Sequence, residues 1–224
     1  MERTQLTRER HRASRDRRAL YRLLDAQIVG HVGVTTSHGP LVVPTAIARV
    51  GDQLLLHGSV ASGWMRLVKK GAAVAIEVTQ VDGIIVARSS FASSIRYESG
   101  VVFGTPEPVA EADKLWALRV ITEKLIPGRS REIRLPTAKE LAQTVVLTME
   151  IEEWSLKVSE GWPEDAPDDV ASDKWAGVVL HQQAPGLICD MPGLPATIAV
   201  PPSVRALAAG WDSVSQGPPD LRSM

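Results

Sequence analysis

Residues 54–66 are Leu54-Leu55-Leu56-His57-Gly58-Ser59-Val60-Ala61-Ser62-Gly63-Trp64-Met65-Arg66. The leucines predict a buried strand, the small residues after them a turn, and residues 64–70 a short basic helix. Small residues let backbone N–H groups approach an anion, and a helix start carries partial positive charge. Arg66 and Lys69 are three residues apart, so both can point the same way from one helical turn. The stretch is therefore either a phosphate-binding turn or an ordinary strand–turn–helix corner with a solvated basic face.

Glycine spacing in this turn narrows the choice of nucleotide-binding folds. The turn matches neither the glycine fingerprint of dinucleotide-binding domains nor the P-loop motif. The motif Gly-x-Ser-x-Gly is also absent, and no serine has a recognisable base partner, so the sequence gives hydrolase chemistry no support.

Composition is that of a globular chain of 224 residues, with 44% hydrophobic and 23% charged residues. Cys189 is the single cysteine, which excludes an internal disulfide and argues against a cysteine zinc site. No apolar run is long enough to span a membrane, and the charged N-terminus shows no signal peptide. We therefore expect cytoplasmic residence and no membrane partner.

Charge is unevenly distributed, although the formal net charge is only −1, which argues against a general nucleic-acid binder. Residues 1–22 hold eight arginines, whereas residues 160–173 are acidic and contain no basic residue. The basic segment can touch nucleic acid, but a solvated helix face or pairing with the acidic loop is favoured.

Hydrophobic periodicity predicts a mainly β protein with peripheral helices. The predicted helices cover 15–26, 64–70 and 112–126, with short ones opening at Thr137 and near 204–209. Asp82-Gly83 is a hairpin signal between two of the strands. The predicted strands cover residues 28–36, 41–50, 54–57, 73–81, 84–91, 101–109 and 144–152.

These elements predict an antiparallel, six- to seven-stranded split β-barrel with α additions. We expect a flexible basic arm over residues 1–13 and the barrel domain over 14–183. The Pro- and Gly-rich residues 184–224 are expected to form a tail, being too short and too broken to build a core of their own.

The order of several short motifs resembles a known family. His57-Gly58-Ser59 is followed by Gly63 and a basic residue, then by Ser94 and Tyr97, and then by Val101-Val102-Phe103-Gly104. This order resembles the pyridoxamine 5′-phosphate oxidase-like flavin-binding split-barrel superfamily, and within it the branch that includes nitroimidazole-resistance reductases. The likeness covers roughly residues 15–158 and extends to Trp175-Ala176-Gly177-Val178.

The resemblance implies a homodimer with FMN in a groove between two barrels. It implies that Val43-Pro44-Thr45 lies along the isoalloxazine. The phosphate would be held by the turn and the helix start after it, through residues His57, Gly58, Ser59, Ser62, Gly63, Trp64, Arg66 and Lys69. Trp64 departs from the lysine or small polar residue common in the short reductases. Members of the branch also bind haem or a deazaflavin instead of FMN.

Five side chains are candidates for specific roles in the site. His57 is either catalytic, since the matching histidine of the nitroimidazole reductases lies beside the flavin, or orients the phosphate turn. Ser94 and Tyr97 either hydrogen-bond the flavin edge or are surface hydroxyls, and the same choice applies to Ser93. Trp175 is a candidate for stacking near the cofactor or across the dimer interface. No two histidines share metal-ligand spacing, so no metal site is expected.

Two functions follow from the resemblance. The first is an FMN-dependent oxidoreductase that passes electrons from a nicotinamide or deazaflavin donor to a small-molecule substrate. The second is a non-catalytic flavin or haem binding and storage protein. Both need the same cofactor site, so the sequence leaves them open.

Overall fold

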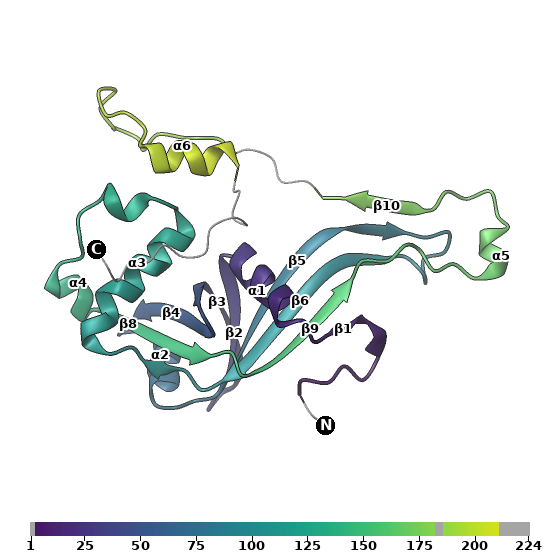
Figure 1. Cartoon of the computed structure of the whole chain (residues 1–224), viewed down its shortest axis with the longest axis horizontal. Coiled ribbons are helices and arrows are strands. Elements are labelled where there is room, and N and C mark those ends of the chain that lie inside the picture. The colour runs from purple at the N-terminus through teal and green to yellow at the C-terminus, as the bar shows by residue number, and fades with distance from the viewer. Residues whose placement is uncertain (1–2, 182–185, 211–224) are drawn as a thin grey trace.

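The computed structural model describes residues 3–181 and 186–210, and these form one ten-stranded sheet with peripheral helices (Figure 1). The strand order is β1-β9-β6-β5-β2-β3-β4-β8-β7, and β10 pairs with β5 outside this path. Every pairing is antiparallel. The strands are β1 (Ala13–Ser14), β2 (Val29–Thr36), β3 (Gly39–Val50), β4 (Gln53–Ser59), β5 (Val74–Val86), β6 (Ser94–Gly104), β7 (Glu107–Pro108), β8 (Thr144–Glu150), β9 (Glu153–Ser159) and β10 (Gly177–Leu180).

The predicted fold class is confirmed: a mostly antiparallel, open sheet carries several helices at its edges. The strand count exceeds the predicted six to seven because β1, β7 and β10 are short edge pairings without a periodic pattern of their own. The helices are α1 (Arg17–Ala26), α2 (Gly63–Lys69), α3 (Lys114–Leu125), α4 (Ala138–Ala142), α5 (Pro167–Val170) and α6 (Pro202–Ala209). Within the described ranges, none of them is long and apolar enough to cross a membrane.

The predicted hairpin at Asp82-Gly83 is wrong. β5 runs without interruption through these residues, and its pairing with β6 shifts register between Val81 and Gly83, which marks a β-bulge. The reversal comes later, in residues 87–93. Asp82-Gly83 does not form a turn because the residues of β5 on both sides of it pair with the same strand, β6. Ser94 and Tyr97 consequently lie on a strand and not in a polar loop.

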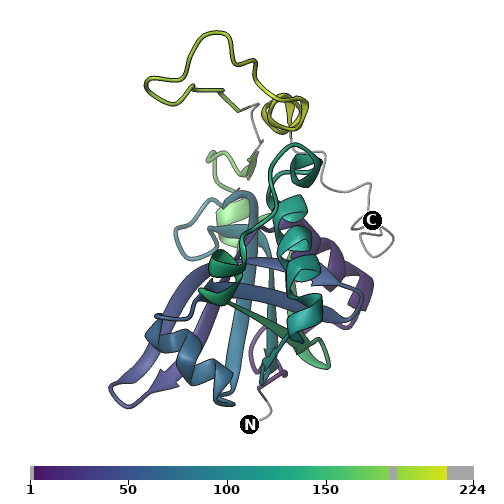
Figure 2. The ribbon, with the colours of Figure 1, turned by 90° about the vertical axis from the view of Figure 1, so that its left-hand side faces the viewer.

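Two hydrophobic clusters hold the fold together. α1 packs Leu20, Leu23 and Leu24 into the curve of the sheet, where the larger cluster includes Leu54 and Leu56. α3 covers the opposite face of β3, β4 and β8, and there Leu55 meets the smaller cluster. Figure 2 shows α3 standing across these strands. The alternation of leucines along β4 thus feeds both clusters.

The far halves of β5 and β6 extend beyond the barrel (Figure 1). β10 pairs with β5 there, from Gly177 opposite Val86 to Leu180 opposite Gly83. β9 borders β6 on the other side. The result is a sheet extension bearing the segment that contains Trp175.

The basic arm and the tail both make contacts in the described residues. Arg3 pairs with Glu153, and β1 pairs with β9. The ion pairs of the arm involve carboxylates outside residues 160–173, as far as the described residues extend. In the tail, the Ser203 amide donates to Glu132 Oε1 at 3.1 Å. Residues 1–2 of the predicted arm and 184–185 and 211–224 of the predicted tail lie outside the described residues.

Candidate functional site

The turn between β4 and α2 is closed by its own backbone. Ser62 N donates to the Ser59 carbonyl oxygen at 3.0 Å, and Ala61 N donates to Ser59 Oγ at 3.2 Å. A Cβ at Gly58 would approach the Met65 side chain to 3.0 Å. Gly58 therefore lets α2 fold back onto β4, with Met65 fully buried. A larger residue at position 58 would therefore have to displace the Met65 side chain.

Two cations project from α2 beside this turn. Arg66 and Lys69 are both exposed, and Arg66 Nη1 donates to the Ala61 carbonyl oxygen at 2.8 Å. In the part of the chain that the structure describes, neither cation has a carboxylate partner. A Cβ at Gly63 would meet open space apart from the Arg66 guanidinium at 4.0 Å. The turn therefore offers uncompensated positive charge and room for an anion.

His57 lies on the α3 side of β4, opposite Val146 of the smaller cluster. Its Nδ1 atom is buried and has no hydrogen-bond partner among the residues that the structure describes. Burial lowers the pKa of His57 below its usual 6.5. The ring is therefore neutral at physiological pH. The unsatisfied nitrogen fits either predicted role, since a bound ligand can satisfy it.

The predicted flavin strand is β3, but its residues face opposite sides. Pro44 is exposed and pairs with His31 of β2, on the outer face of the sheet. Val43 and Thr45 are half-buried and alternate to the other face. Of the three residues, only Pro44 presents its side chain on the outer face.

Ser94, Tyr97 and Trp175 lie on the sheet extension, and Figure 1 shows α2 at the opposite end of the molecule. Ser94 pairs with Ile85, and Tyr97 pairs with Val81. Within one chain, the residues of the β4–α2 turn therefore lie together, whereas Ser94, Tyr97 and Trp175 lie far from that turn. Ser93 closes the β5–β6 connection, because its Oγ accepts from Ala87 N at 3.1 Å.

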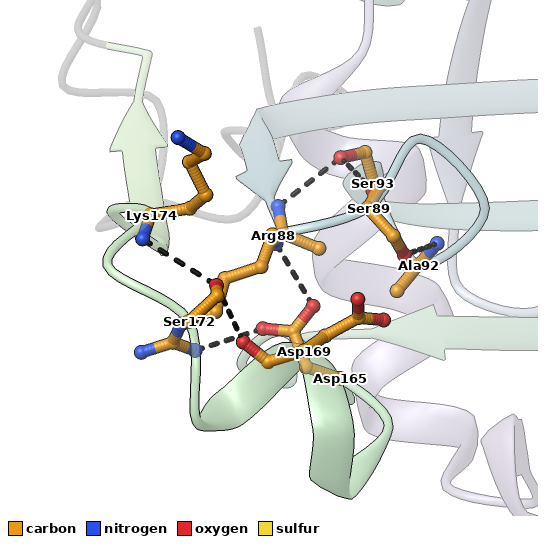
Figure 3. Close-up of polar contacts among 9 residues, drawn as sticks. Arg88, Ser89, Ala92, Ser93, Asp165, Asp169, Ser172 and Lys174 are labelled. Atoms are coloured by element: carbon orange, nitrogen blue, oxygen red, sulfur yellow. Dashed lines mark hydrogen bonds and ion pairs between the residues drawn. The ribbon is translucent and has the colours of Figure 1, made fainter.

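A buried ion pair fastens the acidic segment to this connection (Figure 3). Asp165 Oδ1 accepts from Arg88 N at 2.8 Å, and Asp165 Oδ2 accepts from Arg88 Nη1 at 2.9 Å. The Asp165 side chain is 1% exposed. The pair positions the segment that carries Trp175 and β10, and the sequence patterns gave no sign of it because its partners are distant in the chain.

The outer face of β2, β3, β5, β6 and β10 carries exposed apolar side chains. Cross-strand pairing sets Ile84 beside Ile95 and Val179. The bulge puts Val81 on the same face as Ile84. The exposed large hydrophobic residues of this outer apolar face are Val29, Val42, Val81, Ile84, Ile95 and Val179.

A polar group missed by sequence reasoning lies on that face. His31 Nδ1 is 3.3 Å from Glu77 Oε2, across the pairing of β2 with β5. The Thr79 hydroxyl donates to the other oxygen of Glu77. Metal-ligand spacing could not reveal this group, because strand pairing creates it.

Comparison with known proteins identifies the family of this chain. Residues 16–158 match the family model described as pyridoxamine 5′-phosphate oxidase. No curated protein matches the chain. The chain is similar to a solved structure described as the FAD and haem binding protein from Mycobacterium smegmatis. The two are 43% identical, with a TM-score of 0.85, over 88% of this chain and 98% of that one.

A second similar structure is the flavocytochrome Anf3 from Azotobacter vinelandii, 30% identical over 94% of this chain and 98% of that one, with a TM-score of 0.86. A putative 5-nitroimidazole antibiotic resistance protein from Bacteroides thetaiotaomicron shares the fold. It is 20% identical over 65% of this chain and 86% of that one, with a TM-score of 0.55. The expected resemblance is confirmed: the chain belongs to the pyridoxamine 5′-phosphate oxidase family of flavin-binding split barrels.

Proposed function

We propose that this protein is a flavin-dependent oxidoreductase that also binds haem and works as a homodimer. The observation that carries the flavin assignment is the pair of uncompensated cations, Arg66 and Lys69, beside the β4–α2 turn. The haem assignment is supported by two relatives that span nearly the whole chain and whose descriptions name haem or a cytochrome.

The flavin is proposed to be FAD, with FMN as the alternative. A relative 43% identical is described as binding FAD. Both flavins carry a phosphate on the ribityl chain, so the same turn serves either. Arg66, Lys69 and the hydroxyl groups of Ser59 and Ser62 would hold that phosphate, and a guanidinium suits a phosphate because it donates in a planar fork.

When bound, the flavin supplies the redox chemistry, and the protein supplies binding and orientation. The neutral His57 ring would direct its unsatisfied Nδ1 toward the bound cofactor or substrate. Oxidised and reduced flavin differ in protonation, so a neutral imidazole there can exchange a proton with a reacting group. If His57 has no such role, it orients the turn.

The homodimer is supported by the outer apolar face. Ile84 is 40% exposed and Val179 is 53% exposed, both on the sheet extension. Exposed apolar patches of this kind mark interaction sites. A twofold partner covering the part of this face around Ile84, Ile95 and Val179 would bring Ser94, Tyr97 and Trp175 of one chain toward the turn of the other. That arrangement would reunite the residues that a single chain separates.

The absorption spectrum of the purified protein tests the proposal. We expect the visible absorption bands of oxidised flavin together with the Soret band of haem. Flavin released by denaturation and separated by chromatography distinguishes FAD from FMN. Absence of both bands after incubation with FAD and haemin would refute the cofactor assignment.

Anaerobic titration separates enzyme from storage protein. We expect NADH, NADPH or a reduced deazaflavin to bleach the flavin bands within seconds. A flavin that all three donors leave oxidised would favour the second candidate, a non-catalytic flavin and haem store. This second candidate is supported because the residues already described are sufficient for cofactor binding, without a catalytic group.

A further inference from the structure

His31 lies in the middle of β2, between Pro44 of β3 and Glu77 of β5. Its side chain is 50% exposed, and its Nδ1 is 3.3 Å from Glu77 Oε2. Because directly paired residues project from the same face of a sheet, ring and carboxylate both stand on the outer apolar face.

Glu77 is itself held in place. Its Oε1 accepts a hydrogen bond from the Thr79 hydroxyl, two residues further along β5 and on the same face. The chain of contacts therefore runs from hydroxyl to carboxylate to imidazole. With the proton on Nδ1 and directed at Glu77, the lone pair of His31 is on Nε2. In the described part of the chain, Nε2 has no hydrogen bond or ion pair.

This arrangement is the one that metal-ligating histidines use. A carboxylate on the far ring nitrogen fixes the tautomer, orients the ring and makes the ligating nitrogen more basic. Haem iron is commonly held by such a histidine. The surroundings also suit a flat apolar macrocycle, because Val29, Val42 and Val81 of the same face are exposed by 40%, 62% and 41%.

The other histidines of the described residues lack this combination. Nδ1 of His57 is buried and has no hydrogen-bond partner in the described part of the chain. In His11 it is Nε2 that lies 3.6 Å from Glu9, on an exposed segment of the arm. His38 and His181 show no side-chain hydrogen bond or ion pair within the described ranges.

We propose that His31 Nε2 is the axial ligand of the haem iron, and that Glu77 is the positioning residue that orients it. This inference rests on the proposed function, namely that the protein binds haem. It goes beyond that function in assigning the haem to the outer apolar face and in naming its protein ligand.

The test is haem loading of the full chain with haemin, measured for wild type, His31→Ala, Glu77→Gln and the control His38→Ala. Haem is quantified as its pyridine complex, and flavin is quantified in the same samples. We expect His31→Ala to lose most of its haem and its Soret band while keeping flavin content and circular dichroism. His38→Ala should match wild type. Added imidazole should restore the Soret band of His31→Ala, which a merely structural loss would not allow.

Glu77→Gln provides a second, milder readout. Mutation of a residue that hydrogen-bonds a metal-ligating histidine lowers metal affinity by about 10- to 100-fold. The haem should therefore bind more weakly, with an iron reduction potential shifted upward and an altered iron–histidine vibration in the resonance Raman spectrum. This variant keeps the test decisive even if His31→Ala fails to fold.

Two failures are distinguishable. If wild type loads haem and His31→Ala loads as much, with the same spectrum, the axial assignment is wrong while the haem function stands. If wild type takes up no haemin at all, the haem part of the proposed function fails and the axial assignment fails with it. The flavin measurement remains independent of both.

Discussion

A Cβ atom at Gly83 would lie 2.4 Å from the carbonyl oxygen of Val179. Gly83 follows the bulge in β5, and Val179 belongs to β10, which pairs along this part of the strand. The glycine is thus required because another backbone approaches it closely.

Gly83→Ala should loosen β10 from β5, since the carbonyl contact is with backbone and cannot move aside cheaply. We expect a loss of about 1–3 kcal/mol of stability, as for other overpacked sites. Hydrogen exchange should accelerate at the His181 amide, which donates to the Asp82 carbonyl oxygen. Gly161→Ala is the control, because a Cβ there meets no atom of the described residues within 4 Å. Unchanged exchange in Gly83→Ala would contradict the close approach.

Asp165→Ala should release the acidic segment from the β5–β6 connection. The carboxylate accepts two hydrogen bonds from Arg88, and hydrogen bonds to charged groups contribute on the order of 1.5–3 kcal/mol each. Urea unfolding should show a loss of that order. The neighbouring Glu164→Ala, exposed and without a hydrogen bond or ion pair in the described residues, should unfold as wild type does. Equal behaviour of the two variants would show that the ion pair contributes nothing.

Arg66→Ala should weaken flavin binding through the loss of one charge-assisted bond to phosphate, on the order of 1.5–3 kcal/mol. Affinity for FMN or FAD should fall roughly 10- to 150-fold. Riboflavin, which lacks the phosphate, should bind as before. Arg66→Lys should recover part of the loss, since it keeps the charge but not the planar fork. Fluorescence titration measures all three ligands.

The matched control for this experiment is Arg18→Ala, which removes an exposed arginine from α1. It should leave all three affinities unchanged. Equal weakening of riboflavin and FMN by Arg66→Ala would indicate a disturbed pocket and rule out a phosphate contact.

His57 should titrate below 6.5, because burial lowers its pKa. Between its folded pKa and 6.5, the unfolded state binds more protons than the folded state. Stability therefore rises with pH across that window and is lost as the pH falls through it. Proton NMR of the His57 ring resonances measures the titration, with the denatured chain as the reference. A His57 midpoint at or above 6.5 would contradict the desolvated environment.

Ile84→Asp should convert the proposed dimer to a monomer. Ile84 is 40% exposed on the outer apolar face between Ile95 and Val179, where a carboxylate buried by the partner subunit would be unfavourable. Sedimentation velocity at micromolar concentration should give a monomer for this variant and a dimer for wild type. Val170→Asp, on α5 and 54% exposed, is the control and should remain dimeric. If the wild-type protein is a monomer with flavin bound, the flavin site does not depend on a dimer interface.

Local patterns were sufficient for the central turn and the elements beside it. The leucines of β4, the small residues after them and the basic α2 are adjacent in the chain, so their chemistry is readable in one window. The capping box at Thr137 and Glu140 is equally local, and the structure contains both of its hydrogen bonds. The motif order likewise identified the family, which the comparisons confirm.

Tertiary structure decided what depends on strand pairing. Asp82-Gly83 carries a turn signal, yet a single β6 strand pairs on both sides of it and makes it a bulge. His31 meets Glu77 only because β2 lies beside β5. Each such contact joins residues far apart in the chain, and its free energy comes from the assembled sheet. For that reason, local sequence patterns could not predict these contacts.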